Sequence, residues 1–332
     1  MAAPAASTLT ELVRAAGQTH GSTKIEFVTP EGRQDITIGE VLERARCVAG
    51  GLRALGVQPR DKVTVQLSNR VESMILQFAV LMLDAVLAPI VPVFGAREVA
   101  QVLADAKPTL YITQRRWNKF DYLAALAELP AGSLPDNVVV VDGAPEGYID
   151  WSQLEAGDPV DPVTDVDETA PCLIIYTSGS TGVPKGVQHS RASIFAEALD
   201  YDYRPHADSE VDVYLQGSAA GHIGGYMFPI RAVLYQMRTL VLDGWNAALA
   251  CSLVESERVT AMVVTPFHLV QMLEVVQSSG GDLSSMDMLM IGGAPVPPAL
   301  IRRADAIGVT AVRAYGMSEH PTFAIGAWRD SL

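Results

Sequence analysis

Short apolar runs alternate with helix-length stretches along the chain from residue 63 onward. The runs are rich in Val, Ile and Leu, which favours strands, and the stretches between them are long enough for helices. This alternation predicts βαβ units, a mainly parallel sheet and helices on both of its faces. The predicted strands span residues 63–67, 88–93, 110–113, 137–141, 172–176, 212–215, 239–242, 259–264, 288–291 and 310–313, and the first two predicted helices span residues 71–85 and 96–106.

The segment 157–167, GDPVDPVTDVD, is the strongest candidate for a domain boundary. It is rich in Pro and Asp and has no hydrophobic periodicity, which is typical of a connecting loop. A chain of 332 residues is also long enough for about two domain-sized units. We therefore predict a first α/β lobe at residues 1–168 and a second α/β lobe at residues 169–332.

Residues 74–94 form the stretch that most resembles a membrane span. However, Asp84 would lie near the bilayer centre, and Pro89 and Pro92 would interrupt a single helix. The favoured interpretation is a buried helix that ends at about Val86, followed by a buried strand that ends near Val93, so we expect no transmembrane segment. The N-terminus, MAAPAASTLTEL, lacks the basic start and apolar core of a signal peptide.

Net charge bears on the possible binding partners, and cysteine content bears on the cellular compartment. The chain has 24 Lys and Arg against 38 Asp and Glu, a formal net charge of -14, which disfavours binding to nucleic acid or to anionic membranes. Its three cysteines, Cys47, Cys172 and Cys251, show neither metal-ligand spacing nor a paired pattern. A sparse and odd number of cysteines is typical of a reducing compartment, so we expect a cytoplasmic protein.

The segment 176–187, YTSGSTGVPKGV, is the clearest chemical signal in the chain, because a loop rich in hydroxyl groups and glycine follows a buried strand. Glycine lets backbone N–H groups approach an anion, hydroxyl groups add donors, and Lys185 adds a positive charge on a flexible stem. We therefore predict a phosphate-binding loop. Its residues are Thr177, Ser178, Gly179, Ser180, Thr181, Gly182 and Lys185.

Two common phosphate-binding motifs do not fit this loop. A Walker loop has Gly directly before its Lys, whereas Pro184 occupies that position here. A dinucleotide-binding fingerprint has the spacing Gly-x-Gly-x-x-Gly, whereas the glycines here are Gly179, Gly182 and Gly186. The loop therefore indicates neither a P-loop kinase nor a dinucleotide-dependent dehydrogenase.

The loop resembles the signature of the adenylate-forming superfamily, which includes acyl- and aryl-CoA synthetases, luciferases and peptide-synthetase adenylation domains. Further segments resemble this family in order and spacing, and together they cover nearly the whole chain. They are 53–69 (RALGVQPRDKVTVQLSN), 219–225 (AAGHIGG), 291–295 (IGGAP) and 314–319 (AYGMSE). The resemblance implies an α/β fold with two stacked, mainly parallel sheets flanked by helices.

The resemblance also implies roles for individual residues. Lys185 and the loop would hold the β- and γ-phosphates of ATP, and Glu319 would help to hold Mg²⁺. His222 would lie near the reacting carboxylate and the entry path of the thiol. The adenine side of the site would comprise Gly292, Gly293, Ala294, Pro295, Tyr315, Gly316 and Met317, with the Ser318 hydroxyl donating to the α-phosphate.

The implied reaction joins a small carboxylic acid to the α-phosphate of ATP and then passes the acyl group to the thiol of coenzyme A. Two alternatives stay open: transfer to the thiol of a carrier protein, and a non-catalytic module that binds a nucleotide or an acyl-adenylate. An amino-acid substrate would call for an acidic residue near His222, and Gly224-Gly225-Tyr226-Met227 offers none, which favours a plain acid. The identity of the acid cannot be predicted from these residues.

The sequence ends at Leu332, soon after the Glu319 motif. The resemblance therefore implies the amino-terminal portion of such an enzyme, without its C-terminal lid domain and the catalytic Lys of that domain. We expect low or no activity from this portion alone. Apolar surface near the C-terminus would favour self-association, such as a homodimer.

Overall fold

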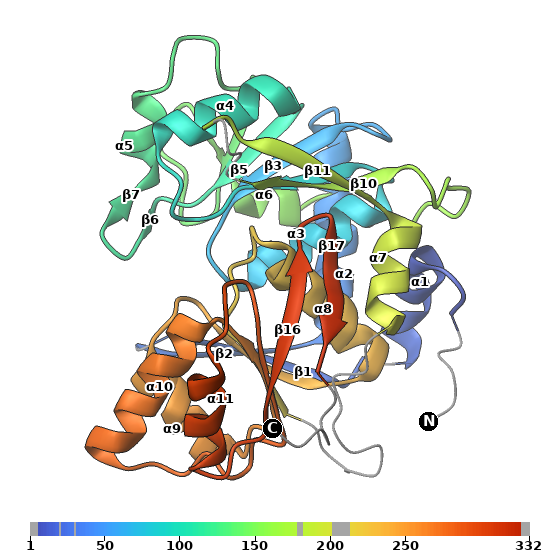
Figure 1. The fold of residues 1–332 in the computed structure, drawn as a ribbon. Helices are drawn as coiled ribbons and strands as arrows, with labels where there is room; N and C mark the ends of the chain where they lie inside the picture. The colour runs from blue at the N-terminus through green and yellow to red at the C-terminus, as the bar shows by residue number, and fades with distance from the viewer. Residues whose placement is uncertain (1–5, 20, 30, 178–181, 201–212, 327–332) are drawn as a thin grey trace.

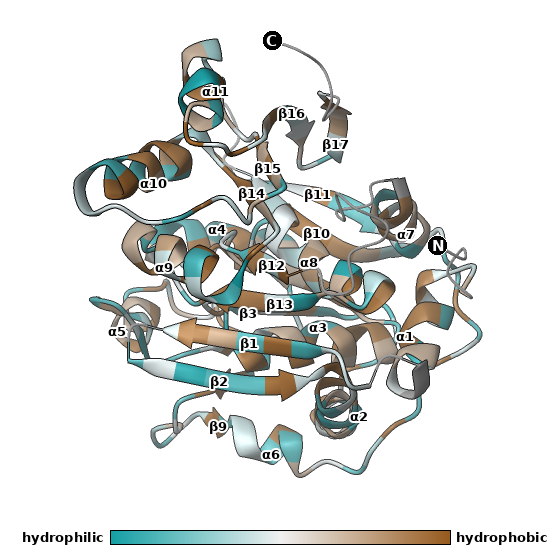
Figure 2. Cartoon of the chain, turned by 90° about the horizontal axis from the view of Figure 1, so that it is seen from below, coloured by the Kyte–Doolittle hydropathy of each residue, from teal (hydrophilic) through white to brown (hydrophobic). Residues whose placement is uncertain are grey.

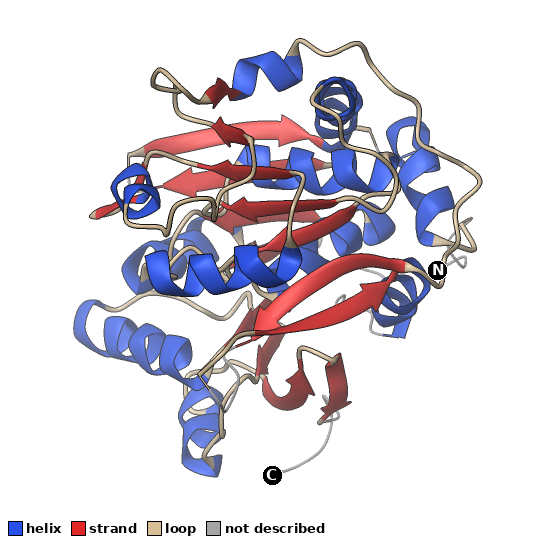
Figure 3. Cartoon of the chain, turned by 90° about the horizontal axis from the view of Figure 1, so that it is seen from above, coloured by secondary structure: helices blue, strands red, loops and turns tan. Residues whose placement is uncertain are grey.

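The computed structural model describes residues 6–19, 21–29, 31–177, 182–200 and 213–326. In this part of the chain, two large sheets are stacked with helices between them and helices on both outer sides (Figures 1 and 3). The prediction of an α/β fold with two stacked, mainly parallel sheets is confirmed. A small hairpin of β6 (Arg116–Trp117) and β7 (Phe120–Asp121) forms a separate two-stranded sheet.

The first large sheet has seven strands among the described residues, in the order β11-β10-β4-β3-β5-β8-β9. All neighbouring strands are parallel except β10 and β11, which form an antiparallel pair around the predicted phosphate-binding loop. Its strands are β3 (Lys62–Gln66), β4 (Val86–Pro89), β5 (Leu110–Thr113), β8 (Asn137–Val140), β9 (Ile149–Asp150), β10 (Pro171–Thr177) and β11 (Lys185–Ser190).

The second large sheet has eight strands in the described ranges, in the order β17-β16-β15-β14-β12-β13-β1-β2. Antiparallel pairs occur only at its two edges, β16 with β17 and β1 with β2. Its strands are β1 (Lys24–Thr29), β2 (Gly32–Thr37), β12 (Val213–Gln216), β13 (Arg238–Leu242), β14 (Ala261–Val264), β15 (Met288–Ile291), β16 (Ala311–Met317) and β17 (His320–Ile325).

Three apolar cores hold these layers together. The core between the sheets is packed by α1 (Leu9–Thr19), α2 (Ile38–Ala54), α3 (Val71–Met82), α6 (Trp151–Glu155), α7 (Arg191–Asp200) and α8 (Ile223–Tyr235). The outer face of the eight-stranded sheet is covered by α9 (Ala247–Glu257), α10 (Pro266–Ser279) and α11 (Pro298–Asp305). The outer face of the seven-stranded sheet is covered by α4 (Ala96–Ala106) and α5 (Tyr122–Ala127).

In the buried stretch 74–94, the helix and the strand have different bounds from the predicted ones. Helix α3 ends at Met82, and β4 occupies Val86–Pro89, so the predicted helix end near Val86 and the predicted strand 88–93 are both displaced. Asp84 explains the early helix end, because its φ of 56° is left-handed and cannot continue an α-helix. Its buried carboxylate pairs with Arg60 at 3.0 Å and Arg191 at 3.4 Å.

Each large sheet takes strands from both sides of residue 168. Strands β1 and β2 join the eight-stranded sheet, whereas β10 and β11 join the seven-stranded sheet. The division of the chain into lobes 1–168 and 169–332 stays a prediction, and the two lobes are not equivalent to the two sheets. Strand β2 is a largely hydrophilic edge strand (Figure 2), which discourages pairing with other chains.

Two findings concern membranes and thiols. None of the helices in the described ranges has both the length and the apolar composition needed to cross a membrane. Cys172 and Cys251 are buried, and burial raises the pKa of their thiols to about 12 and about 11. Both thiols therefore stay protonated and pack as small apolar side chains.

Candidate functional site

The carboxyl ends of parallel strands in the eight-stranded sheet collect three of the predicted motifs. His222 lies in the turn after β12, Gly292 to Pro295 follow β15, and Tyr315 to Ser318 form the end of β16 and the turn beyond it. Because β12, β14, β15 and β16 run in parallel, these segments emerge at the same edge. Ligands of α/β proteins bind at this edge of the sheet.

The predicted phosphate-binding loop joins β10 to β11 at the carboxyl end of β10. Residues Ser178, Gly179, Ser180 and Thr181 lie outside the described part of the chain. Thr177 and Lys185 face each other as the last pair of the β10–β11 ladder, and the Thr177 hydroxyl donates to the Lys185 carbonyl oxygen at 3.5 Å. Lys185 is exposed, and the described residues give it no ion pair, so its ammonium group is free for an incoming phosphate.

A buried histidine connects this hairpin to the Glu319 motif. The Nε2 of His189 on β11 lies 2.7 Å from the carbonyl oxygen of Ser318. Since a carbonyl oxygen only accepts, His189 must carry its proton on Nε2 and donate it. This hydrogen bond joins residues 129 positions apart. It places β11, the strand that begins at Lys185, beside the turn that contains Ser318 and Glu319.

Close backbone contacts shape the predicted adenine side of the site. A Cβ at Gly292 would lie 3.0 Å from the Ala314 carbonyl oxygen, and Gly293 has a left-handed φ of 75°. A Cβ at Gly316 would lie 1.9 Å from the Pro321 carbonyl oxygen across the β16–β17 hairpin. Glycine at these positions therefore lets the three backbone segments approach one another.

An exposed aromatic pair lies on the same hairpin. The side chains of Tyr315 and Phe323 are 57% and 63% exposed, and their rings meet edge to face at 5.9 Å. Exposed aromatic rings provide a surface on which a flat ring can stack. This arrangement fits the expected role of Tyr315 beside adenine and adds Phe323, which the sequence motif did not include.

The side chain of Glu319 suits one metal contact. It is exposed in the turn between β16 and β17, and no group of three His, Cys, Asp or Glu residues in the described ranges could enclose an ion. Mg²⁺ commonly takes one or two protein carboxylates and completes its shell with substrate phosphates and water. A single exposed carboxylate fits that pattern, whereas an all-protein cage does not.

His222 caps helix α8. Its Nδ1 accepts a hydrogen bond from the Gly224 N–H at 3.2 Å, so a neutral His222 carries its proton on Nε2. The ring keeps an exposed face, but the surrounding protein desolvates it and lowers the pKa of His222. His222 is therefore mainly neutral at pH 7 and can present an N–H donor to a carboxylate.

The segment that carries His222 is held by a buried asparagine in the other sheet's layer. Asn69 follows β3, and its Nδ2 donates to the carbonyl oxygens of Ser218 and Leu242, both at 2.9 Å. Its Oδ1 accepts from the Ala220 N–H at 2.7 Å. Asn69 had no predicted role of its own, although a polar residue shortly after a buried strand could have indicated one.

We expect Asn69→Ala to lower the free energy of unfolding by about 3 kcal/mol, because the Leu242 carbonyl oxygen and the Ala220 N–H lose their side-chain partner, and the Ser218 carbonyl oxygen keeps only its bond from Gln216. Urea unfolding measures the loss. Asn137→Ala is the matched control, since Asn137 is half-buried and makes one hydrogen bond, to Leu55. An equal loss in both variants would contradict the anchoring role of Asn69.

Hydrogen bonds and close contacts therefore connect some of the predicted site residues, whereas others have no such connection in the described part of the chain. Lys185 and Ser318 are linked through β11 and His189, and Gly292 lies against Ala314. Within the described residues, His222 makes no hydrogen bond or ion pair to Lys185 or Glu319. A substrate would have to reach from the carboxyl edge of the eight-stranded sheet, near His222 and Glu319, to Lys185 in the seven-stranded sheet.

Comparison with known proteins identifies the family. The sequence profile of the AMP-binding enzyme family matches residues 12–331, nearly the full chain. This chain belongs to the AMP-binding enzymes. Family membership agrees with the resemblance of the loop 176–187 and the four further segments, while the roles of single residues stay predictions.

Relatives of this AMP-binding enzyme include two CoA ligases. A long-chain-fatty-acid–CoA ligase from Thermus thermophilus is 33% identical over 290 residues, which cover 85% of this chain and 52% of the ligase. An indoleacetate–CoA ligase from Aromatoleum aromaticum is 31% identical over 311 residues, which cover 92% and 59%. The chain thus spans little more than half the length of these relatives.

Solved structures show the same fold. The luciferase-like enzyme from the nonluminescent Zophobas morio mealworm superposes with a TM-score of 0.83 at 20% sequence identity, covering 96% of this chain and 74% of that chain. At this identity the likeness supports the fold of the AMP-binding enzyme and not its substrate.

Proposed function

We propose that this AMP-binding enzyme takes part in the ATP-dependent activation of a carboxylic acid, followed by transfer of the acyl group to coenzyme A. The observation that carries the proposal is the hydrogen bond from His189 to Ser318. It joins β11, the strand that begins at Lys185, to the turn that contains Glu319, which supports a cationic and an anionic group acting on one ligand. An ATP–Mg²⁺ complex needs both kinds of group.

In the proposed first step, a carboxylate oxygen attacks the α-phosphorus of ATP, and the bond from that phosphorus to the bridging oxygen breaks. Pyrophosphate leaves with the electron pair, and an acyl-adenylate remains. Negative charge grows on the leaving phosphates, where Lys185 and the loop N–H groups would stabilise it. Mg²⁺, when held by Glu319, would neutralise part of the same charge.

In the proposed second step, a thiolate attacks the acyl carbon and AMP leaves. His222 would orient the carboxylate beforehand by donating from Nε2, because its Nδ1 is already engaged with Gly224. No protein nucleophile is needed, since the phosphoric anhydride supplies the leaving group. Orientation and electrostatics would supply the catalysis.

The proposal also specifies the class of acid that is activated and the thiol that accepts the acyl group. The absence of an acidic side chain at Gly224-Gly225-Tyr226-Met227 favours a plain acid over an amino acid. The two ligases named above support coenzyme A as the thiol, and a carrier-protein thiol is the alternative. We also infer a cytoplasmic location, because the three free thiols suit a reducing compartment.

Acid-dependent exchange of labelled pyrophosphate into ATP tests the catalytic part of the proposal. Because low activity is expected of this portion alone, we expect slow exchange, above the level without acid, with at least one member of a panel of fatty and aromatic acids. If ATP binds but no acid supports exchange, this chain is a non-catalytic nucleotide-binding module. Hydroxamate trapping of the acyl-adenylate is an independent readout of the same step.

A further inference from the structure

The seven-stranded sheet reverses its winding direction between β3 and β5. From β3 the chain runs through α3 to β4 on one side, and then through α4 to β5 on the other side of β3. Helix α3 packs in the core between the sheets and α4 packs in the outer core, so the two helices cover opposite faces. A crevice at the carboxyl ends of the strands is where α/β sheets of this winding bind ligands.

A cavity of about 490 Å³ lies at this point. One wall comes from residues that follow the carboxyl ends of β3, β5 and β8, including Arg70, Trp117 and Asp142. The opposite wall comes from the eight-stranded sheet, including Phe27 and Asp243. Among the residues that the structure describes, no predicted adenylate-site residue lines this cavity, and Asn69 lies between it and the segment that carries His222.

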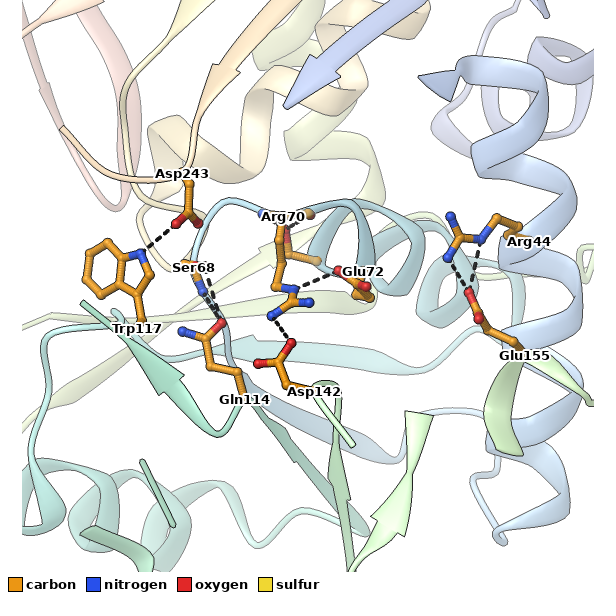
Figure 4. A network of polar contacts seen from close by, with 10 residues as sticks. Arg44, Ser68, Arg70, Glu72, Gln114, Trp117, Asp142, Glu155 and Asp243 are labelled. Carbon is orange, nitrogen blue, oxygen red and sulfur yellow. Dashed lines mark hydrogen bonds and ion pairs between the residues drawn. The ribbon is translucent and has the colours of Figure 1, made fainter. Parts of the chain in front are cut away.

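The arginines of the cavity are already neutralised by carboxylates. Arg70 pairs with Glu72 at 2.7 Å and with Asp142 at 2.8 Å (Figure 4). Arg33 and Arg116 also line the cavity, but both are engaged by acids outside it: Arg33 with Glu257 at 2.8 Å, and Arg116 with Asp121 at 3.0 Å. The cavity therefore offers no unpaired cation to an anionic ligand.

Two carboxylates that line the cavity have no ion pair in the described ranges: Glu31, which is exposed, and Asp243, which is partly buried. One oxygen of the Asp243 carboxylate accepts a hydrogen bond from the Trp117 indole Nε1 at 2.9 Å (Figure 4), and no Lys, Arg or His in the described ranges forms an ion pair with it. Burial raises the pKa of Asp243, in spite of the hydrogen bonds from Ser68 and Trp117 and the nearby charge of Arg70, which lower it. A partly buried carboxylate without a cation is costly unless a partner neutralises it.

We propose that this cavity binds a small organic cation, an amine, amidine or guanidine on a flat or apolar body, whose charge pairs with Asp243. The aromatic rings of Trp117 and Phe27 line the same space, and aromatic rings favour cations near their faces. The ligand would pair its charge with the Asp243 carboxylate and pack its ring against the aromatic side chains, in a cavity large enough for that ring. This site goes beyond the proposed function and does not depend on it.

Benzamidine, benzamide and benzoate test this proposal, because they share one ring and differ in the charge of its substituent. We expect benzamidine to shift the NMR signal of the Trp117 indole N–H saturably in the 332-residue chain. Benzamide should bind at least tenfold more weakly, and benzoate should cause no saturable shift. Trp117→Phe assigns the signal by removing one of the four tryptophans.

Asp243→Asn is the test variant, since Asn keeps an oxygen that can accept from Trp117 but loses the charge. It should weaken benzamidine binding at least tenfold. Asp305→Asn removes the same charge from an exposed position on α11, outside the cavity lining, and should change the affinity less than twofold. Equal binding of the three probes, no saturable shift, or an equal loss in both variants would overturn the proposal. If Asp243→Asn fails to fold, the comparison of probes on the unaltered chain still decides.

Discussion

Lys185→Ala is expected to weaken ATP–Mg²⁺ binding by about 10- to 100-fold, the loss associated with one charged hydrogen bond to a phosphate. The free energy of unfolding should change by less than about 0.5 kcal/mol, because Lys185 is exposed and has no ion pair in the described ranges. Isothermal titration calorimetry measures the affinity, and urea unfolding measures the stability. The expected result is thus a loss of binding without a loss of fold.

Two other variants sharpen this experiment. Lys185→Arg keeps the charge and should recover part of the affinity, although its planar head group does not reproduce the geometry of an ammonium group. Lys119→Ala removes an equal charge from an exposed position next to the β6–β7 hairpin and should leave the affinity unchanged. If Lys185→Ala binds ATP–Mg²⁺ as tightly as the unaltered chain, Lys185 does not hold a phosphate.

Gly225→Ala is expected to lower the free energy of unfolding by about 3 kcal/mol through overpacking. A Cβ at Gly225 would lie 1.9 Å from the Ala219 carbonyl oxygen, which is backbone and cannot rotate away. Either the first turn of α8 or the turn before it must therefore move. Because His222 lies where these two turns meet, the same variant should also impair activation of the acid.

The neighbouring glycine provides the matched control. A Cβ at Gly224 would meet Ser218 and His222 at ordinary contact distances of 3.5 and 3.6 Å. Gly224→Ala should therefore leave the stability unchanged or raise it by up to about 1 kcal/mol, since alanine favours a helix over glycine. Thermal or urea unfolding separates the two variants, and equal stability of both would show that the space at Gly225 is not limiting.

Much of the fold was predictable, because its buried strands leave a strong local pattern. The predicted strands 110–113 and 288–291 and the predicted helix 96–106 match β5, β15 and α4. Hairpin β1–β2 was not predicted, since Gly32–Thr37 is a mostly exposed edge strand without an apolar run. The capping box of Thr37 and Glu40 could have marked the start of α2.

The candidate site was only partly predictable. Its motifs are local in sequence, so the segments around Lys185, Gly292 and Glu319 could be found without a structure. The contacts that arrange them are not local. His189 reaches Ser318 across 129 positions, and Asn69 reaches Ser218 across 149. Such pairings depend on how the two sheets stack, and one sequence contains no direct record of that packing.

Titration with a non-hydrolysable acyl-adenylate mimic tests the central claim most directly. An acyl-sulfamoyl-adenosine carries the adenine, the ribose and the acyl group in one molecule, so it should contact both the Tyr315 side and the His222 side of the edge. We expect it to bind the unaltered chain in a 1:1 ratio, more tightly than ATP–Mg²⁺, and to be displaced by excess ATP–Mg²⁺. A chain that is folded but shows no saturable binding of the mimic would contradict the assignment of this edge as an adenylate site.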